Sequence, residues 1–151
     1  MSALPRAYPV MRLMAADSAD EVRGKLFSFQ LDPWHEAALS PEDIREIGAE
    51  SFVPGEVSMV EDRPDRVAIS ARFQGTGFVV LADQFYPGWE AYIDGKQTKI
   101  YKTNAVQRGV VVPAGEHVVV FKYVPRRIYA SMGVSGIILA GMLFVLFRRR
   151  P

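Results

Sequence analysis

Cysteine is absent from this 151-residue chain, and histidine occurs only at positions 35 and 117. Without cysteine there is no disulfide-stapled fold and no thiol nucleophile, although a domain outside the cytoplasm can do without disulfides. His35 and His117 stand alone, outside HExxH or any other ligand spacing. We therefore expect no metal site and no cofactor.

The common catalytic motifs are also missing. There is no GxSxG nucleophile elbow, and the glycine pair at residues 75–77 is followed by neither a lysine nor a helix start, as a phosphate loop requires. A glycosidase needs two carboxylates about 5–9 Å apart. Asp83, Glu90 and Asp94 are candidates, but nothing in the sequence places two of them on one cleft. We predict no catalytic residue and no enzymatic activity of the chain by itself.

Charge is missing from one long segment, residues 128–147, which reads IYASMGVSGIILAGMLFVLF. As a helix it would be about 30 Å long, the thickness of the hydrocarbon core of a bilayer. A single segment can satisfy its backbone in lipid only as a helix. A helix in a soluble core would carry a polar stripe, and this run has none. The sequence thus predicts a transmembrane helix over residues 126–147.

The distribution of charge suggests an orientation. Residues 1–125 contain all seventeen acidic residues and thirteen basic ones, for a net charge of −4, whereas the remainder carries +5. Arginines flank the run on both sides, with three of them after it, which favours a cytoplasmic tail at residues 148–151 and an extracytoplasmic main domain. The first residues do not read as a signal peptide, because prolines and arginines interrupt them. We therefore expect a fragment, or a truncated relative, of a multi-spanning protein.

Residues 1–125 are long enough for one domain, which we predict to be mainly β. Ser18 with Glu21 forms a capping box, so a short helix should run to about residue 27, with Val22, Leu26 and Phe29 on its buried face. Ser40-Pro41 should start a second short helix that ends at Gly48.

The rest of the domain has the alternation and turn spacing of an antiparallel β-sandwich. Asp94-Gly95 should form a primed hairpin turn. Pro9 should place the first strand at a sheet edge. The two valine-rich strands near residue 115 should pair in the middle of a sheet and be covered on both faces. The predicted strands are residues 6–13, 35–39, 56–61, 66–73, 78–82, 89–93, 97–101, 106–112 and 118–123.

Aromatic residues concentrate between positions 85 and 101, among carboxylates and amides. Aromatic faces bind the C–H surfaces of sugars while polar side chains hold the hydroxyls. Our candidate ligand-binding residues are Tyr86, Trp89, Tyr92, Asp94 and Asn104. In the alternative interpretation the aromatics are core residues, because alternation puts Trp89 on the same face as Ala91 and Ile93.

Residues 81–125 closely resemble the C-terminal extracytoplasmic domain of the YfhO family of bacterial membrane proteins. The order and spacing of the matching blocks, followed at once by the uncharged run, make the resemblance specific, while residues 40–55 carry little of it. The blocks are Tyr86-Pro87-Gly88-Trp89 with Asp94-Gly95-Lys96; Lys102-Thr103-Asn104-Ala105; Val112-Pro113-Ala114-Gly115; Phe121-Lys122-Tyr123-Val124-Pro125; and the opening Leu4-Pro5-Arg6-Ala7-Tyr8.

The resemblance implies more than this chain contains. Family members are long proteins with many membrane helices, similar to C-type glycosyltransferases that use lipid-linked sugars, and relatives are implicated in glycosylating envelope polymers such as lipoteichoic acid. Their catalytic carboxylate lies in a loop near the first membrane helices, which has no counterpart here. We therefore expect a non-catalytic accessory domain in the bacterial cytoplasmic membrane that binds glycan or braces a catalytic core. The alternative is a purely structural or protein-interaction domain without sugar affinity.

The partners that this reading implies are membrane lipid, the membrane helices of a parent or partner protein, and an envelope glycan or lipid-linked sugar. We expect no nucleic-acid partner.

Overall fold

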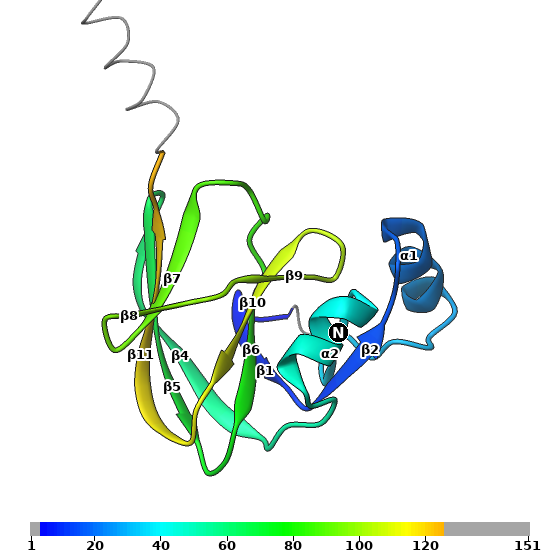
Figure 1. Ribbon diagram of the computed structural model, residues 1–151, viewed down its shortest axis with the longest axis horizontal. Coiled ribbons are helices and arrows are strands. Elements are labelled where there is room, and N and C mark those ends of the chain that lie inside the picture. Colours follow the sequence, from blue (N-terminus) through cyan, green and yellow to red (C-terminus); the bar gives the residue numbers. More distant parts are fainter. Residues whose placement is uncertain (1–3, 126–151) are drawn as a thin grey trace, which may run out of the picture.

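The computed structural model describes residues 4–125 (Figure 1). They form two helices, α1 (Ala19–Phe27) and α2 (Pro41–Ile47). The strands are β1 (Ala7–Val10), β2 (Arg12–Ala15), β3 (Glu36–Leu39), β4 (Gly55–Arg63), β5 (Arg66–Phe73), β6 (Gly77–Leu81), β7 (Trp89–Ile93), β8 (Lys96–Thr98), β9 (Tyr101–Thr103), β10 (Gln107–Val112) and β11 (Gly115–Tyr123). The predicted class, mainly antiparallel β with two short helices, is confirmed.

Two antiparallel sheets make up the body of the domain. One has four strands in the order β1-β6-β10-β9, and the other has five in the order β4-β5-β11-β7-β8. The predicted edge position of the Pro9 strand is confirmed, because β1 lies at the edge of the four-stranded sheet. The valine-rich strands β10 and β11 both occupy central positions, as predicted.

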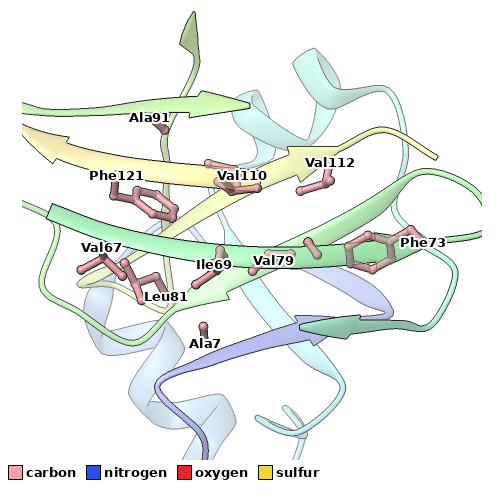
Figure 2. Close-up of a cluster of buried hydrophobic side chains, with 12 residues drawn as sticks. Ala7, Val67, Ile69, Phe73, Val79, Leu81, Ala91, Val110, Val112 and Phe121 are labelled. Carbon is pink, nitrogen blue, oxygen red and sulfur yellow. The ribbon is translucent and has the colours of Figure 1, made fainter. Parts of the chain in front are cut away.

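The main hydrophobic core lies between these two sheets (Figure 2). The predicted inward face of β5 is confirmed, since Val67, Ile69, Ala71 and Phe73 are all buried. Period-two alternation sends these side chains to one side of the pleat. The four-stranded sheet contributes Ala7, Val79, Leu81, Val110 and Val112; the five-stranded sheet adds Ala91, Val119 and Phe121.

A third layer covers the outer face of the four-stranded sheet. Strands β2 and β3 pair in parallel through the crossover helix α1, and α2 follows. The second core cluster joins the sheet to this layer; its buried members are Tyr8, Val10, Leu13, Ala37, Leu39, Ile44, Phe52, Phe78, Val80 and Tyr101. Strand β6 is consequently buried on both faces, as its unbroken apolar sequence predicts.

The local capping and turn signals all formed as expected. The Ser18 hydroxyl accepts a hydrogen bond from the Glu21 N–H at 3.1 Å, and Ser40 caps α2 in the same way. Helix α2 ends at Gly48. Asp94 and Gly95 both have positive φ, 49° and 81°, which is the type I′ geometry of a two-residue hairpin.

Three strand predictions were wrong because they extended local patterns across changes of sheet. Residues 6–13 form two strands that pair with different partners, β6 and β3. Residues 97–101 do not form one strand, since β8 ends at Thr98 and β9 begins in the opposite sheet. The two valine-rich strands do not pair: β10 already lies between β6 and β9, and β11 between β5 and β7, so the turn between them connects the two sheets.

Two burial predictions were also wrong. Phe29 is 93 % exposed, because α1 ends at Phe27 and the helical periodicity stops there. Val118 on β11 is 45 % exposed, so this strand is not covered on both faces.

Within residues 4–125 no helix is long and apolar enough to cross a membrane. The predicted helix at 126–147 and the tail at 148–151 lie outside the described residues.

Candidate functional site

The candidate site lies at the end of the sandwich where β6 and β11 finish and β1 and β7 begin (Figure 1). Residues 86–89 form a tight turn there, in which the Trp89 N–H donates to the Tyr86 carbonyl at 3.5 Å. Gly88 has φ 107°, and a Cβ at this position would lie 2.8 Å from the Tyr123 ring. Its carbonyl accepts from the Val124 N–H at 2.6 Å. The glycine therefore lets the 86–89 turn lie directly against the end of β11.

The aromatic residues of this turn differ in their exposure. The Tyr86 side chain extends into solvent and the residue is 59 % exposed. Trp89 is half-buried against the main core and its ring packs on Tyr123, with centroids 5.6 Å apart. The guanidinium carbon of Arg108 lies 3.9 Å from the Trp89 ring centroid, the geometry of a cation–π contact. Trp89 thus belongs to the core and also forms part of the rim of the site.

Four charged residues gather next to this aromatic pair. Arg6 donates from Nε and Nη2 to the two oxygens of Asp83, at 2.8 and 2.9 Å, and from Nη1 to Asp62. The hydrogen bonds that Arg6 donates to these two carboxylates raise the pKa of Arg6 above its ordinary value, the bond to Asp83 most. Arg108 donates from Nη2 to the same Asp83 oxygen that Arg6 Nη2 uses, at 3.2 Å. One carboxylate is therefore shared by two guanidinium groups.

Arg108 is the most unusual residue of the cluster. It is 3 % exposed, and its Nε and Nη1 have no hydrogen-bond partner among residues 4–125. Burial lowers the pKa of Arg108 below its ordinary value, opposed by the charge of Asp83 and reinforced by that of Arg6. Each desolvated donor left without an acceptor costs about 1–3 kcal/mol. The fold therefore holds a cation whose hydrogen-bonding capacity is only partly used.

Sequence reasoning missed Arg108, although a signal was present. In β10, period-two alternation places position 108 on the same face as the core residues Val110 and Val112. A charged residue in phase with core valines must be paired or functional.

The structure brings together two of the five predicted ligand-binding residues, Tyr86 and Trp89. Tyr92 alternates away from Trp89 on β7, and its hydroxyl donates to Glu90 at 2.6 Å. Asp94 lies beyond the other end of β7, in the hairpin turn. Asn104 lies in the turn between β9 and β10, where its side chain accepts from the Ala38 N–H at 2.8 Å and donates to Gln107 at 2.9 Å.

Asp94 forms an ion pair that makes stability depend on pH. It accepts from the Val118 N–H at 2.9 Å and contacts His117 Nδ1 at 2.5 Å. The hydrogen bond to Asp94, then that to the Ala114 carbonyl, raises the pKa of His117, while the bond with His117 lowers the pKa of Asp94. The raised pKa of His117 adds stability to the folded state below about pH 6.5, and this stability is lost as pH rises through the folded-state pKa. The lowered pKa of Asp94 adds stability above about pH 4, and this stability is lost when the solution is acidified further.

We therefore expect the protein to be more stable at about pH 5.5 than at about pH 8, and we expect His117→Gln to remove most of that difference. The unfolding midpoint of the two proteins at the two pH values tests this. A difference that persists unchanged in His117→Gln would mean that another group is responsible.

Part of the chain matches a known protein family. The model of the family described as "Bacterial membrane protein YfhO" matches residues 84–135. This segment includes the 86–89 turn, Arg108 and all strands from β7 to β11, and it confirms the resemblance noted in the sequence. The similarity noted at the opening of the chain, residues 4–8, lies outside the matched segment. No curated protein and no solved structure matches the chain.

Proposed function

We propose, from the YfhO-family match over residues 84–135, that the described domain is an extracytoplasmic accessory part of a YfhO-like membrane protein. In this proposal it performs no catalysis, binds an envelope glycan or lipid-linked sugar at the 86–89 turn, and braces a membrane-embedded catalytic core. Residues 126–147 would anchor it in the membrane, with residues 148–151 in the cytoplasm.

The family description supports a membrane location. The matched segment begins just before β7 and continues past Pro125 into the uncharged run. Only two residues, Val124 and Pro125, follow β11 before the arginines that flank that run. With so short a connection, the 86–89 turn would lie close to the lipid surface, where lipid-linked sugars are found.

The observation that carries glycan binding is the exposed Tyr86 in the same tight turn as the half-buried Trp89. Tyr86 and Trp89, the latter packed on Tyr123 and Arg108, would offer aromatic surface to a sugar ring at a small cost in entropy. The carboxylate and guanidinium groups of Asp83 and Arg6 lie at the same end of the sandwich and can bond sugar hydroxyls.

A retention assay on immobilised envelope polysaccharide tests this role. We expect the protein in detergent to be retained, and Tyr86→Ala to lose retention while keeping its unfolding midpoint. Phe29→Ala is the matched control, because Phe29 is 93 % exposed but lies after α1, away from the turn. Tyr92→Ala should act like Tyr86→Ala only if the binding surface extends onto the outer face of β7.

One set of contacts favours the alternative, a structural domain without sugar affinity. Tyr92, Asp94 and Asn104 all have hydrogen-bond partners within the domain, and Trp89 packs on the core. If the unmodified protein is not retained on any envelope glycan, this alternative holds and the aromatic cluster serves packing alone.

A further inference from the structure

The unsatisfied side of Arg108 points to a ligand of a different chemistry from a neutral sugar. A guanidinium has five N–H donors. In Arg108 one nitrogen, Nη2, reaches Asp83, while Nε and both hydrogens of Nη1 find no acceptor among the described residues. These are three donors on one planar cation that is 3 % exposed.

Asp83 does not neutralise this cation fully. Arg6 Nε and Nη2 already donate to its two oxygens at 2.8 and 2.9 Å. The hydrogen bond from Arg108 Nη2 is the longest of the three, at 3.2 Å. Arg6 has a second carboxylate partner, Asp62, whereas no salt bridge joins Arg108 to any described carboxylate other than Asp83. The local arrangement leaves positive charge on the Arg108 side of the cluster.

Trp89 is a partly exposed side chain that covers Arg108. The indole covers the guanidinium at 3.9 Å and is itself only half-buried, at the rim formed by the 86–89 turn. Residues 82–88 form no strand, and the backbone bonds that hold this segment include Ala82 N–H to Arg6 O, 2.7 Å, and Phe85 N–H to Val106 O, 2.5 Å. A ligand can reach these donors only if the Trp89 side chain moves off the guanidinium, and the half-buried indole is the part of this cover that borders solvent.

We propose that Arg108 is the base of an anion-binding site, in which Nε and Nη1 donate to the oxygens of a phosphate group that enters beside Trp89. The phosphate can belong to a phospholipid headgroup or to a soluble phosphate. Charge-assisted hydrogen bonds of this kind are short and strong, and the planar guanidinium suits phosphate better than an ammonium group does. Residues 1–125 have a net charge of −4, so general electrostatic attraction does not draw anions to the domain. This site adjoins the proposed glycan site and shares Trp89 with it, but it binds the charged oxygens of a phosphate and not the neutral face of a sugar, so it does not rest on the proposed function.

Fluorescence of Trp89 reports on the site directly. The chain has two tryptophans, so a Trp34→Phe background leaves Trp89 as the single emitter. The full chain in maltoside micelles, which contain no phosphate, is titrated with inorganic phosphate and, separately, with phosphatidylglycerol added to the micelles. The unfolding midpoint is followed in the same samples, because a ligand that binds the folded state raises it.

The matched variants are Arg108→Met and Arg72→Met, both in the Trp34→Phe background. Arg72 is a control of the same charge: its side chain is 69 % exposed and its partner Glu116 lies 3.9 Å away, opposite it at the other end of β5 and β11. We expect a saturable change in Trp89 emission and a raised midpoint in the background protein and in Arg72→Met. In Arg108→Met we expect affinity to fall about tenfold or more.

Each outcome decides the proposal. A response to phosphatidylglycerol alone identifies a lipid headgroup, and a response to inorganic phosphate in the maltoside micelles identifies a soluble ligand. The proposal is overturned if the background protein shows no response to either, whatever the variants do. It is overturned equally if Arg108→Met responds as strongly as Arg72→Met.

Discussion

Asp83→Ala is expected to lower the free energy of unfolding by about 3–5 kcal/mol, because it leaves the buried Arg108 without its only salt-bridge partner among the described residues. The same substitution removes both hydrogen bonds that the Arg6 guanidinium donates to Asp83. Desolvation of Arg108 cannot be relieved by a rotation into solvent, since the residue is 3 % exposed and lies under the Trp89 ring. The cost arises from the cation that remains, not from the carboxylate that is removed.

Two comparison variants separate this mechanism from ordinary loss of a surface charge. Asp62→Ala also removes a partner of Arg6, but the side chains of both residues are substantially exposed, at 54 % and 39 %, so we expect a loss of about 1 kcal/mol or less. Arg108→Met removes the buried cation and leaves Asp83 paired with Arg6; such replacements are often neutral or stabilising by about 1–4 kcal/mol.

Urea unfolding of the purified chain in detergent measures the free energy of unfolding of all three variants. Equal losses for Asp83→Ala and Asp62→Ala would contradict the mechanism. If Arg108→Met is at least as stable as the unmodified protein, then Arg108 does not contribute to the stability of the fold, which agrees with a binding role.

Phe78→Ala is the second change with a large expected effect, again a loss of about 3–5 kcal/mol. Phe78 is 0 % exposed and lies on the outer face of β6, where its ring packs on Phe52 and Tyr101 at centroid distances of 5.6 and 6.3 Å. It also fills the space beside Gly109, where a Cβ would approach within 2.5 Å of the ring. Removing the ring leaves a cavity between the four-stranded sheet and the layer of β2, β3 and α2.

Because that cavity lies between two layers, we expect the effect to be local as well as global. Hydrogen exchange of the backbone amides in β2 and β3 should become faster in Phe78→Ala than that of β5 and β11, which pack on the other core. Val118→Ala is a control, since Val118 is 45 % exposed and should cost less than about 0.5 kcal/mol. A uniform acceleration in all strands would show that the layers unfold together.

The sequence by itself determined the features that depend on a few neighbouring residues. The caps at Ser18 and Ser40 satisfy backbone donors within three residues, and the Asp94-Gly95 turn needs only two residues of positive φ. The inward face of β5 follows from alternation alone. The family resemblance is determined in the same way, by motifs whose order and spacing are visible without coordinates.

Only the tertiary structure decided which strands pair and which charged side chain is buried. Local alternation has no information on the sheet to which a strand belongs, so the change of sheet between β8 and β9, and between β10 and β11, could not be read from it. Arg108 meets Asp83 and Arg6 from three separate strands or loops, far apart along the chain. Contacts of that kind arise when the chain closes on itself, and their energies depend on burial that only the packed sheets create.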